Sequence, residues 1–145
     1  MRAVIQRVSQ SSVHINGAQV SAVGQGLVIL LGIARGDDAP AAKSLAAKIA
    51  ALRIFEDTGG RMNLSAVDVS AEILLVSQFT LCADTSRGRR PGFETAAPPD
   101  EAGKLCSEFA AAVRAQGLEM REGVFGAHML VKIFNDGPVT FVLDA

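Results

Sequence analysis

Polar residues directly flank two strand-like apolar runs, and they are the first candidates for chemistry in this chain. Ser77-Gln78-Phe79-Thr80 comes after the run Ile73 to Val76, and Asn135 to Thr140 leads into the run Val139 to Leu143. Strands that only fill a core favour β-branched and aromatic residues, and a proline donates no hydrogen bond to a sheet ladder. We therefore expect both segments to present hydroxyl, amide and main-chain groups at the rim of a sheet. Departures from the residue preferences of secondary structure are most common at functional sites.

The segment from Ser77 to Thr80 allows two kinds of ester chemistry. In the first, Ser77 or Thr80 is a covalent nucleophile, which needs a histidine base, and the only histidines are His14 and His128. The motif GxSxG is absent, and each histidine is more typical of a surface or structural residue, so we assign no triad. In the second, backbone N–H groups and the Gln78 or Thr80 side chain stabilise developing charge, which requires no histidine.

The pair Gly137-Pro138 lies between two expected strands and is typical of a tight turn. Because only about 5 to 6% of X-Pro bonds in folded proteins are cis, the spacing alone predicts a trans turn. Arg7 is either a solvated strand residue or a binding residue. Phe125 and Met129 precede a strand, where such side chains are more often core than ligand contacts.

A long irregular segment from Cys82 to Pro98 contains Arg87, Arg89 and Arg90. Clustered arginines can contact phosphates, although a charged loop is usually only solvated. With 14 basic against 15 acidic residues the formal net charge is −1, so any nucleic-acid contact must be local. A small module that binds RNA acceptor stems without cleaving them is the alternative to an enzyme, and the near-neutral charge speaks against it because such a module needs a broad basic face.

The bulk properties indicate one domain covering residues 1–145, long enough to bury a core. The N-terminus lacks the long apolar segment of a signal peptide or membrane span, so we expect a cytoplasmic protein with no membrane partner. Cys82 and Cys106 have no CxxC spacing and no neighbouring histidine pair, so no metal is expected.

Hydrophobic periodicity predicts a mixed α/β fold, a sheet with two helices on one face. Asn16-Gly17 is typical of a hairpin turn, and the continuous apolar run Gly26 to Ile33 indicates a central strand covered on both faces. Helical spacing begins after Asp38, a candidate cap, and again at Pro98. The remaining expected strands are residues 2–8, 11–15, 73–79, 129–134 and 139–143.

The two polar segments together resemble the signature motifs of the D-aminoacyl-tRNA deacylases (the D-tyrosyl-tRNA(Tyr) deacylase family), which cleave the ester between a D-amino acid and tRNA. The resemblance covers nearly the whole chain, from Met1 to Val8 through Leu52 to Phe55, Met62 to Leu64 and Ala83 to Thr85, and on to the last strand. It implies a partly open barrel of two packed sheets with two helices outside, assembled as a two-fold homodimer. Composition and spacing do not show the dimer.

The resemblance also implies how a D-aminoacyl-tRNA would be held. The 3′-terminal adenosine and the ester would lie against Ser77, Gln78, Phe79 and Thr80, with Phe125 and Met129 lining the adenosine pocket. The 2′-hydroxyl of the tRNA would take part in hydrolysis, and Thr80 would assist without becoming a covalent nucleophile. No metal, no organic cofactor and no DNA partner is implied.

A chiral filter is the last implied feature. Gly137-Pro138 would be cis and would project its carbonyls into the active site of the partner subunit, where they would exclude L-amino acids sterically. A D-amino acid would direct its side chain outward and glycine has no side chain to clash, so glycyl-tRNA would also be a substrate. Arg7 would orient the Gly-Pro segment by bonding its carbonyls.

Overall fold

The structure is a computed structural model, and it describes residues 1–86 and 88–145. Arg87, one of the three loop arginines, lies outside the described residues. In chain order the elements are β1 (Arg2–Ile15), β2 (Ala18–Val23), β3 (Gly26–Gly32), α1 (Ala39–Ala51), β4 (Phe55–Glu56), β5 (Met62–Leu64), β6 (Glu72–Ser77), the 3-10 helix η1 (Phe79–Cys82), α2 (Pro99–Arg114), β7 (Met120–Glu122) and β8 (Leu130–Asp144).

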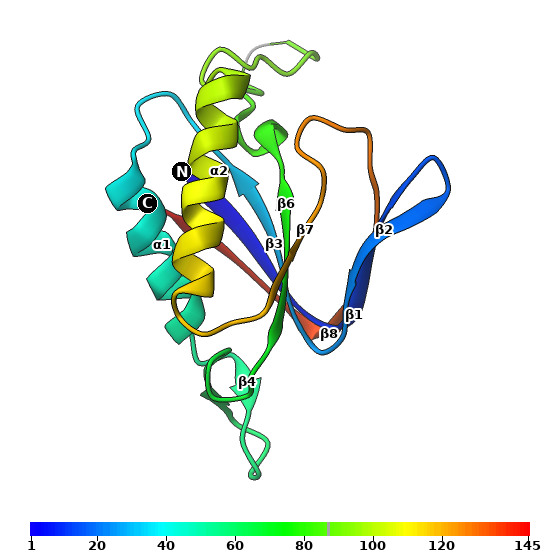
Figure 1. Ribbon diagram of the computed structural model, residues 1–145. Helices are drawn as coiled ribbons and strands as arrows, with labels where there is room; N and C mark the ends of the chain where they lie inside the picture. The colour runs from blue at the N-terminus through cyan, green and yellow to red at the C-terminus, as the bar shows by residue number, and fades with distance from the viewer. Residues whose placement is uncertain (87) are drawn as a thin grey trace.

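One strongly curved sheet dominates the described part of the chain (Figure 1). β1 pairs antiparallel with β2, β3 and β8, whereas β3, β6 and β7 are parallel. The first half of β1, from Arg2 to Val8, pairs with β3, and its second half, from Ser11 to Ile15, pairs with β2. β8 pairs with β1 along both halves, and β2 comes into contact with β6 and β7, so the sheet bends back over itself into a nearly closed barrel. β4 and β5 form a separate short hairpin.

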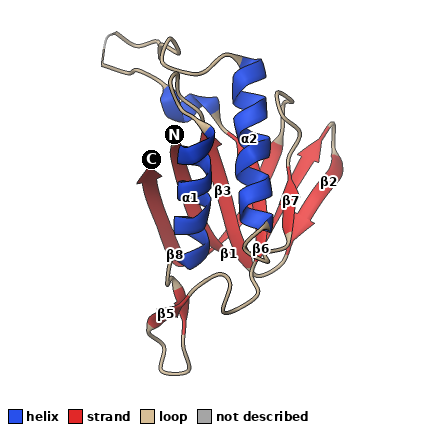
Figure 2. Cartoon of the chain, turned by 60° about the vertical axis from the view of Figure 1, so that its left-hand side comes forward, coloured by secondary structure: helices blue, strands red, loops and turns tan. Residues whose placement is uncertain are grey.

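Two hydrophobic cores pack against the opposite faces of β3 and β6. On one face Leu27 and Ile29 are fully buried beneath α1 and α2, which lie side by side over the sheet (Figure 2). On the other face Val28 and Leu74 belong to a cluster with Val13 from the bent half of β1. Burial on both faces explains the unbroken apolar run of β3 and confirms it as a central strand.

Both helices begin where the sequence predicts. The Asp38 carboxylate accepts a hydrogen bond of 2.9 Å from the Ala41 N–H, and a proline lies in the first turn of α1. Asp100 and Glu101 lie in the first turn of α2, where the helix dipole favours acidic side chains. None of the described helices combines the length and apolar character that a membrane crossing requires.

The expected pairs of short strands at the two ends of the chain are wrong. Residues 2–8 and 11–15 belong to the single bent strand β1. Residues 129–134 and 139–143 largely form one strand, β8, which passes through Gly137-Pro138 without reversing direction. Gln6 pairs with Thr140 and Val8 with Asn135, so residues 136–139 form a bulge opposite Arg7. The chain does not turn here because β1 continues as its partner on both sides of the bulge.

Candidate functional site

The first polar segment lies at the carboxyl end of two parallel strands. Leu31 of β3 is paired with Ser77 of β6, so both strands finish at the same edge of the sheet. The Gln78 N–H donates to the Leu31 carbonyl at 2.8 Å, and η1 begins at the next residue. The strand therefore ends at Ser77 and not at Phe79 as expected, and the chain turns along the rim of the sheet.

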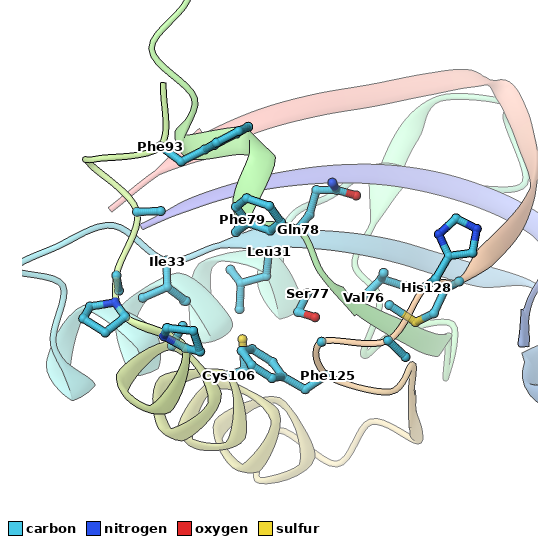
Figure 3. Close-up of a pocket in the computed structure, with 18 of the residues that line it drawn as sticks. Leu31, Ile33, Val76, Ser77, Gln78, Phe79, Phe93, Cys106, Phe125 and His128 are labelled. Carbon is cyan, nitrogen blue, oxygen red and sulfur yellow. The ribbon is translucent and has the colours of Figure 1, made fainter. Parts of the chain in front are cut away.

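A cavity of about 610 Å³ opens at this rim (Figure 3). Leu31 and Ser77 lie on the sheet side of the cavity, and Cys106 of α2 and Phe125 of the β7–β8 loop lie across from them. Five of the candidate residues line the cavity, namely Ser77, Gln78, Phe79, Phe125 and Met129. Thr80 adjoins the lining, and its hydroxyl accepts a hydrogen bond from Gln78 Nε2.

Several cavity residues carry no sequence signal that would have found them. Ile33 and Arg35 follow β3, and Phe93 lies in the long segment without hydrophobic periodicity. Another part of the wall comes from residues 96–98 before α2 and from the helix itself, at Pro99, Ala102 and Cys106. Local sequence gives no signal for them because these side chains meet only after α2 and the segment before it have packed on the sheet.

The rim offers aromatic surface and backbone donors together. Phe79 is 58% exposed, and its ring meets that of Phe93 edge to face with centroids 5.0 Å apart. In η1 the first hydrogen bond runs from the Leu81 N–H to the Gln78 carbonyl. The N–H groups of Phe79 and Thr80 precede that bond, so they have no acceptor within the helix.

Among the described residues at this rim, no hydrogen bond joins a nucleophile to a base. His14 lies on β1, and its Nε2 is 3.0 Å from the Ser12 hydroxyl. His128 lines the cavity, but the described hydrogen bonds include none between it and Ser77 or Thr80. Burial, followed by the nearby Glu122, raises the pKa of the Cys106 thiol to about 11, so this cavity thiol stays protonated at neutral pH and is a poor nucleophile.

Cation ligands are also sparse in the described part of the chain. No three of its His, Cys, Asp and Glu side chains are grouped closely enough to hold a metal ion. The exposed Phe79 ring and the main-chain N–H groups at the start of η1 can support binding of an apolar ring and stabilisation of an oxyanion.

The second polar segment is held rigidly on β8. The Gly137-Pro138 bond is cis, contrary to the expectation from spacing and in agreement with the family resemblance, and Gly137 has φ +118°. Asn135 bridges the two ends of the bulge, because its Nδ2 donates to the carbonyl of Arg7 at 2.9 Å and to that of Val139 at 3.0 Å. Sequence reasoning did not assign this role to Asn135.

Arg7 fixes the same bulge from beneath. The residue is only 5% exposed, and its Nη1 donates to the Ile54 carbonyl at 2.8 Å. Its Nε is 3.1 Å from Asp136 Oδ2, but the N–H is not aligned as a hydrogen bond, so this contact is mainly coulombic. Within the protomer Arg7 thus contacts the segment through Asp136 and not, as expected, through the carbonyls of Gly137 and Pro138.

The two segments are apart within one protomer. Arg7, beside the bulge, pairs with Leu27 at the start of β3, whereas the cavity lies at the end of that strand, beside Leu31. Gly137 and Pro138 do not line the cavity. A single copy therefore does not bring the Gly-Pro segment to Ser77–Thr80.

Comparison with known proteins decides the family. A family model described as D-Tyr-tRNA(Tyr) deacylase matches residues 4–144. The chain belongs to this family. The resemblance seen in the sequence motifs is thereby confirmed over almost the full length.

Members of the deacylase family match this chain end to end. Proteins named D-aminoacyl-tRNA deacylase from Thermomicrobium roseum and Deinococcus radiodurans are each 54% identical, over 145 and 144 residues. The first match covers 100% of this chain and 94% of the relative, and the second covers 99% of both.

Two solved structures have the same fold as this deacylase-family chain. One, named c-Myc DNA Unwinding Element Binding Protein, superimposes with a TM-score of 0.94 at 41% identity and covers 100% of this chain and 99% of its own. The other, described as a probable eukaryotic D-amino acid tRNA deacylase, has a TM-score of 0.83, with 99% and 98% covered, and at 19% identity supports the fold alone.

Proposed function

We propose that this protein hydrolyses the ester that links a D-amino acid to the 3′-terminal adenosine of tRNA. The observation that carries the proposal is the family match over residues 4–144 together with a cavity lined by Ser77, Gln78 and Phe79 of the first polar segment. The shape and lining of the cavity support binding of a nucleoside, because ligand sites of about 300 to 1,000 Å³ with mostly apolar walls are typical of small-molecule binding.

In this function the adenine lies between the apolar walls, and the ester carbonyl lies at the start of η1. Phe79, Phe125 and Met129 contact the base and ribose. The N–H groups of Phe79 and Thr80 stabilise the oxyanion that forms when water attacks, and Gln78 fixes the Thr80 hydroxyl. The substrate 2′-hydroxyl assists the proton transfer, so no histidine is required.

Chirality is selected by backbone from a second copy of the chain. Asp136, Gly137 and Pro138 are all exposed, and Asn135 and Arg7 hold them from within the protomer. A rigid main-chain wall excludes an L side chain by steric overlap, whereas a D side chain points away from it. Glycine has nothing to exclude, so glycyl-tRNA is also hydrolysed.

The exposed surface of β8 supports a homodimer. β8 pairs only with β1 in the described part of the chain, so its other edge is open. Leu130 and Val142 on this strand are each 60% exposed and Phe134 is 52% exposed. An open edge strand with large apolar side chains is normally covered, and a second copy would cover it next to the Gly-Pro segment.

The substrate places the reaction in the cytoplasm, where tRNA is used in translation. DNA binding, which the name of one solved relative ascribes to that protein, is not proposed for this chain. Its net charge of −1 supplies no broad positive surface for a duplex.

The proposal is tested by following ester loss from D-Tyr-tRNA, L-Tyr-tRNA and Gly-tRNA. We expect hydrolysis of the first and third only, and no hydrolysis of D-Tyr-tRNA that ends in 2′-deoxyadenosine. His14→Gln and His128→Gln should both retain activity, because no base is drawn from them. Equal loss from D- and L-Tyr-tRNA, or loss from neither, would contradict the function.

Sharing of the site between subunits has its own test. A cavity variant, Phe79→Ala, and a filter variant, Gly137→Val, are each expected to be inactive. Unfolded and refolded together, they form mixed dimers in which one of the two sites is intact, so about a quarter of wild-type activity should return. If mixing restores nothing while mixed dimers are present, the filter does not act across the interface.

A further inference from the structure

Arg35 is the one permanently charged side chain among the described residues that line the cavity. The other lining residues are apolar, or polar and neutral, apart from His128. A single cation at the edge of an otherwise uncharged pocket selects for an anion at one position. The position of Arg35 therefore indicates where an anionic group of the ligand would lie.

The structure holds Arg35 firmly at the mouth of the cavity. Its backbone N–H donates to the Thr95 carbonyl at 2.8 Å, and its Nε donates to the Glu94 carbonyl at 2.8 Å. The neighbouring Ala34 bridges to Ala96 in the segment that also carries Phe93. Arg35 is thus anchored to the outer wall of the cavity while its side chain stays exposed.

The outer end of this guanidinium has no partner within the described structure. None of the ion pairs among residues 1–86 and 88–145 involves Arg35, and its only side-chain hydrogen bond uses Nε. Nη1 and Nη2 are therefore available for a ligand. By contrast, Arg2 is bonded to Asp144, and Arg7 is buried against Ile54 and Glu56.

The chain topology places Arg35 on the same rim as the ester site. Arg35 lies four residues beyond Leu31, and Thr80 lies three residues beyond Ser77, which is paired with Leu31 in the sheet. The ester of an aminoacyl-adenosine is on the 3′ side of the ribose, so the 5′ side must leave the cavity toward the rest of the RNA. The first anionic group on that path is the phosphodiester 5′ of the terminal adenosine.

We propose that Arg35 binds this phosphodiester, which joins the terminal adenosine to the preceding nucleotide, through its two free Nη groups. This inference rests on the proposed function and adds a binding residue to it. Guanidinium and phosphate match in geometry and form paired, charge-assisted hydrogen bonds. Arg35 thereby makes the protein favour an RNA 3′ end over a lone aminoacyl-nucleoside.

The test removes the phosphate from the substrate and the charge from the protein separately. Two substrates are compared, the D-Tyr ester of adenosine and the D-Tyr ester of the dinucleotide CpA, and kcat/KM is measured for each. The variants are Arg35→Gln, Arg35→Lys and the control Arg61→Gln. Arg61 is exposed in the β4–β5 hairpin and does not line the cavity, so its loss changes the net charge equally.

We expect Arg35→Gln to lower kcat/KM for the CpA ester roughly tenfold, mainly through KM, because the contact is made in both the ground state and the transition state. For the adenosine ester the loss should be under about twofold, since no phosphate is present to lose its partner. Arg35→Lys should retain part of the effect as a point charge, and Arg61→Gln should change neither substrate. The salt dependence of log kcat/KM for the CpA ester should become shallower by about 0.7 in Arg35→Gln.

Equal losses on the two esters would overturn the inference, because Arg35 would then act only by holding the segment at Glu94 and Thr95. Unchanged kcat/KM for the CpA ester in Arg35→Gln would overturn it as well. Failure of the proposed function gives a different result, in which the wild-type protein hydrolyses neither D-Tyr ester nor D-Tyr-tRNA.

Discussion

Gly137 offers the sharpest test of how the filter segment is built. A Cβ added there would lie 2.7 Å from Val139 Cγ2 and 3.1 Å from Arg7 Nη2, on a backbone with φ +118°. Gly36 is a matched control, because its φ is +85° and a Cβ there would have no neighbour within 4 Å. Both positions disfavour an L side chain through φ, and only Gly137 adds steric overlap.

The two costs can be estimated separately. Alanine in a left-handed conformation costs about 1 to 2 kcal/mol, which is the whole effect expected for Gly36→Ala. Overpacking against Val139 and Arg7 adds about 1 to 3 kcal/mol, so Gly137→Ala should lower the free energy of unfolding by about 2 to 5 kcal/mol. At this chain length, that corresponds to a fall in Tm of roughly 5 to 15 °C.

Urea and thermal unfolding followed by circular dichroism measure these values, at one fixed protein concentration because subunit association would shift them. The double variant Gly137→Ala/Val139→Ala identifies the overlap, since it removes the Cγ2 atom. It should cost less than the sum of the single variants by about 0.5 to 3 kcal/mol. If Gly137→Ala is no more destabilising than Gly36→Ala, the bulge is not packed on Arg7 and Val139 as described.

Three further predictions concern stability. Arg7→Met leaves the buried Ile54 carbonyl without its donor and should lower the free energy of unfolding in urea by about 2 kcal/mol. Asp136→Asn changes a half-exposed carboxylate and should lower it by under about 1 kcal/mol, and the reverse order would contradict the ion-pair geometry. Burial raises the pKa of Cys106 from 9.0 to about 11, so the unfolded chain loses this proton first, and stability should be full below pH 9 and fall between pH 9 and 11. Unfolding measured across this range should show a smaller fall in Cys106→Ala, and an identical fall would assign it to other groups. Asp38→Ala removes the cap of α1 and should cost about 1 kcal/mol by thermal unfolding, while Asp38→Asn retains most of the stability; equal losses would mean that charge, and not capping, is what Asp38 contributes.

Local patterns predicted the helices and the central strand well because each has a short-range cause. The cap at Asp38 and the prolines at both helix starts act within one turn, and the apolar run from Gly26 needs only its own side chains to indicate burial. The same local signals were misleading at Gly137-Pro138. Turn residues there build a bulge, because β1 remains paired on both sides of it.

The candidate site was predictable where the polar residues adjoin a strand end and was missed where distant segments meet. Ser77, Gln78 and Phe79 stood out because they interrupt an apolar strand, and the structure places them on the cavity. Phe93 and Arg35 do not interrupt an apolar strand, so no local pattern in the sequence indicates them. Each reaches the cavity only because the segment before α2 folds back to bridge the end of β3.

By itself, the sequence determined the family, the two helices and the two polar segments that interrupt strands, because all of these depend on neighbouring residues and on motif order. Only the tertiary structure decided that β1 and β8 run as long bent partners, that Asn135 and Arg7 hold the Gly-Pro bulge, and that Arg35 lies on the same rim as Ser77. These features depend on strand register and on the packing of segments remote in the chain, which no local pattern encodes.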